Sequence, residues 1–158
     1  MKITDITATP LKIGKSLVRV QTDAGVEGWS EGPGVNKIVP GRNGSVFEAY
    51  LESIIKPTLI GENPLEIDRH WETLATGKED RLYKLPAGVV GVIDVALWDL
   101  LGKETGQPVY NLMGGAARTT IPLYWSTGSG WKFTPQEMLD IVKVGFDMGF
   151  EAFKIRMD

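Results

Sequence analysis

AGVVGVIDVALWDLLGK, residues 87–103, is the stretch around which the fold can be predicted. Its large apolar residues recur at intervals of three and four, the spacing of one face of an α-helix. They form a wide stripe that other parts of the chain must cover: Val89, Val92, Ile93, Ala96, Leu97, Leu100 and Leu101. The sequence therefore predicts a long, half-buried helix here, in a region that ends at Gly106-Gln107-Pro108.

Before this helix, the chain opens with segments typical of β-strands. Residues 3–7, 16–22 and 26–30 read as strands, and Asp23-Ala24-Gly25 between the last two is a hairpin signal. The segments are too closely spaced for crossover helices. We therefore expect a three-stranded antiparallel meander at the start of an α+β domain.

Two further helices and a long loop are expected between the meander and the long helix. The first helix should end before Pro57, and the second should begin after Asn63-Pro64 with Asn63 as its N-cap. The buried face of the second helix is predicted to be Ile67, Trp71, Leu74 and Ala75. Residues 32–44 contain several glycines and prolines and form a loop of a kind that often carries function.

A change of pattern near Gly115 predicts a domain boundary. After it, residues 121–126 read as a strand, Thr134-Pro135-Gln136-Glu137 matches a helix-opening capping box, and residues 150–157 return to strand. Strand, helix and strand at this spacing form a β-α-β unit of a parallel sheet. An eight-stranded barrel needs about 250 residues, so only its first two strands and first helix are expected here.

Composition argues against several classes of function. The 17 basic and 20 acidic residues are interspersed, with a net charge of -3, so no basic stripe attracts nucleic acid or a membrane surface. There is no cysteine, and His70 is the single histidine, which excludes disulfides and thiolate metal sites. No signal peptide or membrane-length apolar run is present. We expect a cytoplasmic protein without nucleic-acid or membrane partners.

The last predicted strand carries the main candidates for chemistry. Alternation of side chains places Lys154 and Arg156 on one face at the carboxyl end of the strand, where active sites lie in α/β barrels. The pattern alone leaves open that these charges simply emerge into solvent. Asp94 and Asp99 diverge on the long helix, and we interpret them as capping or ion-pairing groups.

Residues 87–103, running into GQPVYNLMGG at 106–115, resemble the hallmark helix of the enolase superfamily, in its mandelate racemase and muconate lactonizing branch. MKITDI at 1–6 and TDAGVEGWSE at 22–31 are also similar, and the resemblance covers the whole chain. It implies a capping domain of α+β type at residues 1–115. Residues 116–158 would then be the first two strands and first helix of a TIM-like (β/α) barrel, and we expect a homo-oligomer.

The resemblance also implies a reaction step. Relatives remove the proton next to a carboxylate of a small molecule, and Mg²⁺ stabilises the enediolate. The metal ligands are expected beyond residue 158. Lys154-Ile155-Arg156 matches the family's Lys-x-Lys position, but arginine, with a pKa above about 12, is a poor base whose planar fork suits binding a carboxylate. We expect Arg156 to orient substrate, Lys154 to supply positive charge, and a histidine on a later strand to be the main base.

Substrate contacts are expected from three more places. Ser126 matches a substrate-contacting serine of mandelate-racemase-like enzymes, and the two cap loops supply Lys15, Asn36 and Lys37 as candidates. The first cap loop is short, which resembles galactonate- and mannonate-dehydratase-like members and favours a lyase that dehydrates a sugar acid. An isomerase (racemase, epimerase or cycloisomerase) acting through the same enediolate is the alternative within the superfamily. A non-catalytic fragment or interaction module is the alternative outside it.

Overall fold

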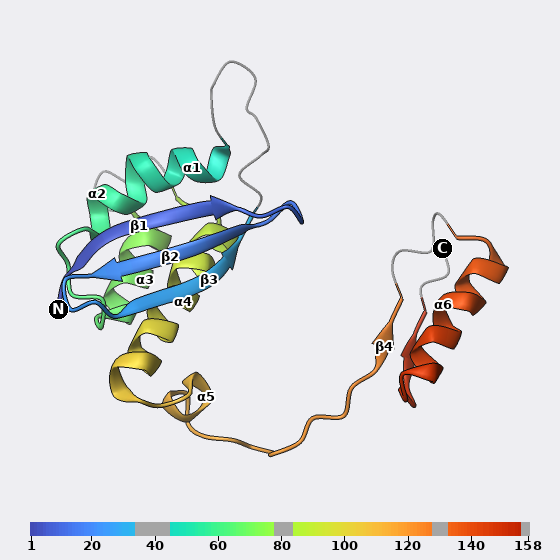
Figure 1. Cartoon of the computed structure of the whole chain (residues 1–158). Helices are drawn as coiled ribbons and strands as arrows, with labels where there is room; N and C mark the ends of the chain where they lie inside the picture. The colour runs from blue at the N-terminus through green and yellow to red at the C-terminus, as the bar shows by residue number, and fades with distance from the viewer. Residues whose placement is uncertain (34–44, 78–83, 128–132, 156–158) are drawn as a thin grey trace. The chain divides into compact units, whose positions relative to one another are not determined.

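The computed structural model describes residues 1–33, 45–77, 84–127 and 133–155. The chain divides into two compact units, Met1–Gly115 and Ala116–Asp158. The first contains a three-stranded sheet with helices, and the second contains two paired strands with one helix (Figure 1). In the described ranges, no helix is long and apolar enough to cross a membrane.

The first unit begins with the meander that the sequence predicts. Its antiparallel strands lie in the order β1-β2-β3 and have the bounds β1 (Ile3–Pro10), β2 (Ser16–Thr22) and β3 (Glu27–Gly32). The β2–β3 turn uses Gly25 at φ 78°, a backbone conformation that glycine adopts without steric cost. Thr22 Oγ1 donates to the Val26 carbonyl at 2.7 Å across the same turn. This confirms the hairpin expected at Asp23-Ala24-Gly25.

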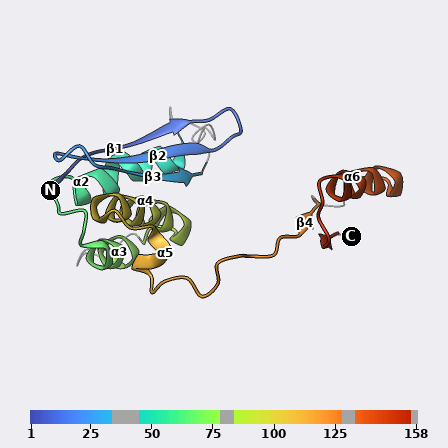
Figure 2. The same ribbon diagram turned by 60° about the horizontal axis from the view of Figure 1, so that its bottom comes forward.

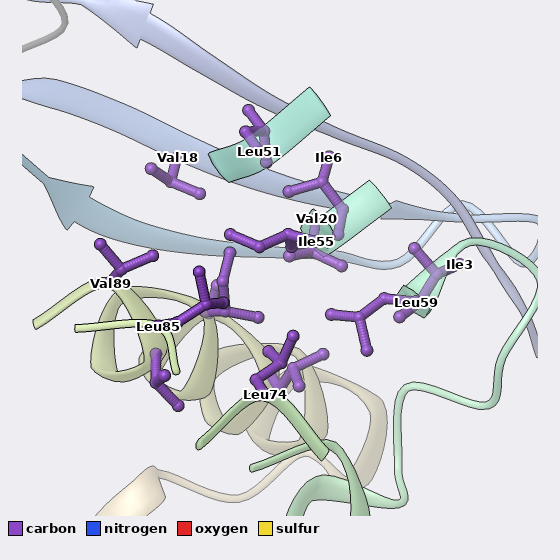
Figure 3. Packing of buried hydrophobic residues seen from close by; sticks show 14 of the residues in the cluster. Ile3, Ile6, Val18, Val20, Leu51, Ile55, Leu59, Leu74, Leu85 and Val89 are labelled. Carbon is purple, nitrogen blue, oxygen red and sulfur yellow. The ribbon is translucent and has the colours of Figure 1, made fainter. Parts of the chain in front are cut away.

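Helices cover one face of this sheet. The helical segments are α1 (Val46–Tyr50), the π-helical turn η1 (Leu51–Ile55), α2 (Lys56–Leu59), α3 (Ile67–Thr76), α4 (Ala87–Thr105) and α5 (Val109–Leu112). Figure 2 shows α3 and α4 on the same side of the three strands. Ile6 and Val20 of the sheet belong to the same buried cluster as Leu74 and Val89 of these helices (Figure 3).

The expected helix end before Pro57 is wrong. Helical structure runs from α1 through η1 into α2, which ends at Leu59. The Lys56 N–H donates to the carbonyl of Leu51, five residues earlier, so the helix widens by one residue per turn before the proline. Pro57 then lies in the first turn of α2, where a missing N–H costs little.

The expected start of the next helix is also wrong. Its N-cap is Glu66 rather than Asn63, whose Oδ1 instead accepts the Leu65 N–H at 3.2 Å in a tight turn. The predicted buried face is wrong at Trp71, which is 52% exposed, because His70, at 2% exposed, faces the core instead. His70 Nε2 lies 2.7 Å from the Asn63 carbonyl oxygen, so the ring ties the turn to the helix.

The long helix α4 supplies the largest share of the core. Its buried apolar residues are Val89, Val90, Ile93, Ala96, Leu97 and Leu100. The predicted stripe is thus confirmed, although Val92 and Leu101 are only partly buried. The helix ends at Gly106, which is left-handed at φ 65° and serves as its C-cap.

Contact between α4 and the edge strand β3 is unusually close. A Cβ on Gly28 would lie 1.9 Å from the Ala96 carbonyl oxygen, so only glycine fits there. Ser30 Oγ donates to the Val92 carbonyl at 2.7 Å, and the Trp29 N–H donates to Asp99 Oδ2 at 2.8 Å. These bonds occupy polar groups at an edge that would otherwise be open to pairing with another chain.

The second unit is a short β-α-β unit. It consists of β4 (Trp125–Ser126), α6 (Pro135–Asp147) and β5 (Phe153–Lys154). The strands pair in parallel, as predicted, but over fewer residues than the sequence indicates. The predicted capping box is confirmed, because Thr134 Oγ1 accepts the Glu137 N–H while the Glu137 carboxylate accepts the Thr134 N–H.

Close packing holds α6 against the two strands. A Cβ on Gly145 would lie 2.7 Å from Trp125 and from Phe153, so the helix backbone rests directly on both rings. Phe146 and Phe153 have ring centroids 4.3 Å apart, and Trp125 and Phe150 have theirs 5.2 Å apart. The strands therefore present Trp125 and Phe153 to the helix.

Replacing Gly28 by alanine should destabilise the first unit by about 1 to 3 kcal/mol or more, because the new methyl group overlaps backbone rather than a movable side chain. The matched control is Gly91→Ala on α4, where a Cβ meets nothing within 4 Å. It should be neutral or stabilise by up to about 1 kcal/mol. Urea unfolding measures both. Equal midpoints for Gly28→Ala and wild type would contradict the close contact.

Candidate active site

Ser126 and Lys154 lie side by side at the ends of the two parallel strands. They are register partners, one position beyond the partners Trp125 and Phe153. Because side chains alternate along a strand, Ser126 and Lys154 project on the face opposite α6. Both are exposed. The structure thus brings together two of the predicted site residues, at the carboxyl ends of strands.

Hydrogen bonds from the end of β4 hold this pair in register. The Trp125 N–H donates to the Ala152 carbonyl at 2.8 Å, and the Thr127 N–H donates to the Lys154 carbonyl at 3.1 Å. Thr127 Oγ1 lies 3.3 Å from the same Lys154 oxygen. Thr127 is 4% exposed, so these groups are shielded from water. The main chain of Lys154 is therefore anchored to the strand that carries Ser126.

An ammonium group beside a hydroxyl can bind an anionic oxygen ligand. Lys154 offers three N–H donors and a positive charge, and Ser126 offers one O–H donor. Hydrogen bonds from a charged donor to a carboxylate are among the stronger ones in proteins. The pair is thus suited to the carboxylate of a small molecule. The predicted site residues Arg156, Asn36 and Lys37 lie outside the described residues.

Lys15 belongs to the first unit, at the tip of the β1–β2 hairpin. A hydrogen bond from the Leu11 N–H to the Lys15 carbonyl at 2.8 Å closes this short turn. Its ammonium lies 2.9 Å from the Glu31 carboxylate, and both side chains are largely exposed. Exposed pairs of this kind contribute about 0 to 1 kcal/mol. Little free energy is therefore lost when the Lys15 ammonium leaves Glu31 for another anion.

The two aspartates of α4 differ: Asp99 forms the predicted ion pair, whereas no cap or ion pair of Asp94 is found among the described residues. Asp99 accepts the Trp29 N–H and lies 2.5 Å from the Lys103 ammonium, which confirms its predicted ion pairing. Asp94 is partly buried, and burial, followed by the nearby charge of Asp68, raises the pKa of its carboxyl. Across the described ranges, no three His, Cys, Asp or Glu side chains gather to hold a metal ion. These residues therefore do not fit a Mg²⁺ ion, and none is assigned to one.

Sequence reasoning missed Thr127. It identified Ser126 and Lys154 by their place at strand ends, whereas threonine is an ordinary strand residue and gives no signal by itself. Only the structure shows that both its N–H and its hydroxyl reach the Lys154 carbonyl.

The first unit is an antiparallel sheet with helices, as in an α+β capping domain. The second is a parallel β-α-β unit with polar groups at its strand ends, as at the start of an α/β barrel. Residues 7–114 match the family model of the mandelate racemase / muconate lactonizing enzyme N-terminal domain. The chain belongs to this family of the enolase superfamily.

Curated relatives include a D-galactonate dehydratase and a member of the D-galactonate dehydratase family. The chain is 37% identical over 137 residues to a D-galactonate dehydratase family member from Streptomyces bingchenggensis, covering 87% of this chain and 31% of the relative. It is 34% identical over 156 residues to D-galactonate dehydratase from Pectobacterium atrosepticum, covering 98% of this chain and 38% of the relative. The chain thus spans about a third of the length of these relatives.

Solved structures agree with this family. An enolase of the mandelate racemase subgroup from Agrobacterium tumefaciens superposes with a TM-score of 0.73 at 27% identity, over 98% of this chain and 38% of its own. A Mesorhizobium loti protein assigned as a dehydratase gives a TM-score of 0.76 at 30% identity, over 98% of this chain and 42% of its own. An Agrobacterium radiobacter enolase with bound sodium and L-malate gives a TM-score of 0.74 at 26% identity, over 100% of this chain and 40% of its own.

Replacing Asp94 by asparagine should change the pH dependence of stability. A raised pKa in the folded state means that the fold favours the protonated carboxyl of Asp94. Protonation of Asp94 therefore stabilises the fold fully below the unfolded-state pKa of about 3.9, and this stabilisation is lost as pH rises through the folded-state pKa. Asp94→Asn should therefore stabilise the protein at neutral pH and give little gain in strong acid. Thermal unfolding between acidic and neutral pH measures this.

The exposed Glu72→Gln substitution on α3 is the control, since it removes a negative charge without relieving burial. It should leave the melting temperature close to that of wild type. An Asp94→Asn variant that is less stable than wild type at neutral pH would contradict the assignment of Asp94 as an unfavourably buried charge.

Proposed function

We propose that the full-length enzyme is a lyase that dehydrates a sugar acid by removing the proton next to its carboxylate and passing through an enediolate. The observation that carries the proposal is the pairing of Ser126 with Lys154 at the ends of adjacent parallel strands. The family of the chain supports the same reaction, as do a relative named D-galactonate dehydratase and a relative named as a member of that dehydratase family.

The proposed chemistry uses the positive charge of Lys154 where negative charge develops. Removal of the C2 proton of a 2,3-dihydroxy acid moves an electron pair onto the carboxylate, so a nearby ammonium binds the transition state more tightly than the substrate. The Ser126 hydroxyl donates a hydrogen bond to the same carboxylate. Departure of the C3 hydroxyl with a proton then releases water, and the resulting enol becomes a 2-keto-3-deoxy acid.

Other proposed groups complete the site. Arg156 would orient the substrate through its planar fork, and a histidine on a later strand would be the main base. Lys15, Asn36 and Lys37 on the cap loops would select the substrate. We propose Mg²⁺ as the metal, which would neutralise charge on the enediolate. We propose that its ligands come from residues outside this sequence.

Proton exchange in deuterated water tests the reaction directly. Full-length enzyme with Mg²⁺ is incubated with a panel of sugar acids, and NMR follows loss of the C2 proton signal together with formation of a 2-keto-3-deoxy product. Dehydration that leaves solvent deuterium at C3 of the product is expected for at least one acid. Exchange with inversion at C2 and no keto product would show a racemase or epimerase instead. Neither exchange nor product across the panel would contradict the proposal.

Lys154→Met in the same assay tests the described site. It removes the ammonium while keeping an unbranched side chain of similar length, and it should lower turnover by about 10²-fold to 10³-fold, the range for loss of one electrostatic donor. The matched control is Lys143→Met on α6, which removes an exposed lysine of the same unit and should leave turnover unchanged. Equal turnover in both variants would remove Lys154 from the mechanism.

A further inference from the structure

The carbonyl of Lys154 accepts two donors from a single residue. The Thr127 N–H at 3.1 Å is the regular hydrogen bond of the parallel ladder. The Thr127 hydroxyl at 3.3 Å is an addition to that ladder, because strand pairing does not require it. The next ladder bond along, from Trp125 to Ala152, has no side-chain counterpart among the described contacts.

The Thr127 hydroxyl is buried, so its hydrogen bond matters for stability. Thr127 is 4% exposed, and a buried hydroxyl without a partner would cost about 1 to 3 kcal/mol. Its partner in the described structure is the Lys154 carbonyl oxygen. Two donors on one oxygen restrict rotation of the peptide that follows Lys154 more than one donor does. The direction in which the Lys154 side chain leaves the strand is set by the same stretch of backbone.

The burial of Thr127 argues against a direct role on substrate. It directly follows β4, and alternation continued by one residue puts it on the face that Trp125 presents to α6. Ser126 and Lys154 project from the opposite face and are exposed, whereas Thr127 is buried. Any effect of Thr127 on the reaction therefore passes through Lys154.

We propose that Thr127 is a positioning residue, whose hydroxyl holds the main chain of Lys154 so that its ammonium lies beside Ser126 at the strand ends. This inference rests on the proposed function for its consequence in catalysis. The structural part of the inference is that the Thr127 hydroxyl, directly after β4, holds the main chain of Lys154. This part depends on the described contacts alone. Misplacement of a catalytic group by about 1 Å can cost up to about 10²-fold in rate.

Valine and serine at position 127 separate the hydroxyl from the packing of the side chain. Thr127→Val keeps the shape and removes the hydroxyl, whereas Thr127→Ser keeps the hydroxyl and removes a methyl group. In full-length enzyme, the valine variant should lower kcat by about 10-fold to 10²-fold with little change in KM. The serine variant should recover most of that loss. Circular dichroism checks folding, and Thr127→Ala replaces valine if the valine variant does not fold.

A second readout does not depend on turnover. Lysine acetylation by acetic anhydride across a range of pH, quantified by mass spectrometry, gives the reactivity of Lys154 relative to the exposed Lys143 of the same protein. The valine variant should change this ratio, and the serine variant should restore it. Failure of the wild type to act on any sugar acid would overturn the proposed function, yet the labelling would still test Thr127.

The outcomes are distinct. A Lys154 to Lys143 ratio that is the same in wild type and the valine variant overturns the positioning role, whatever the turnover. Equal changes in the valine and serine variants also overturn it, because the effect would then follow any disturbance of packing at position 127 rather than loss of the hydroxyl. A change in the valine variant that serine reverses supports it.

Discussion

The approach of α4 to the edge strand β3 is the constraint on which the first unit depends. The helix backbone lies so close that the Ala96 carbonyl oxygen occupies the place where a side chain of Gly28 would begin. At this distance Ser30 and Trp29 reach α4 with hydrogen bonds of 2.7 and 2.8 Å. The apolar stripe of α4 is buried as a consequence, because these contacts hold the helix directly against the sheet.

Local signals predicted much of this fold from the sequence. The meander depends on strand alternation and on Gly25 in its turn, and the start of α6 depends on the reciprocal bonds of Thr134 and Glu137. Each signal is complete within a few residues. The 3.6-residue period of α4 is longer but still contained in one segment, which is why its buried face was also predictable.

Failures occurred where neighbouring turns and burial override the usual preference of a single residue. Pro57 ordinarily ends a helix, but a π-turn before it lets the chain continue and keep Ile55 and Leu59 in the core. Asn63 is a good N-cap, but it is used in a turn that His70 completes. For the site, alternation placed Lys154 on its face, yet its register with Ser126 is a property of two strands and could not be read from either one.

The two units share a device for close packing. In the first unit the glycine lies on the strand, at Gly28, and in the second it lies on the helix, at Gly145. Contact of Gly145 with Trp125 and Phe153 fixes which face of β4 and β5 meets α6, and so fixes the opposite face for Ser126 and Lys154. Among the described residues, β4 and β5 pair over two residues each. Helix packing behind the strands and the bonds from Thr127 add to these ladder bonds and so to the rigidity that a charged group needs to act at a defined position.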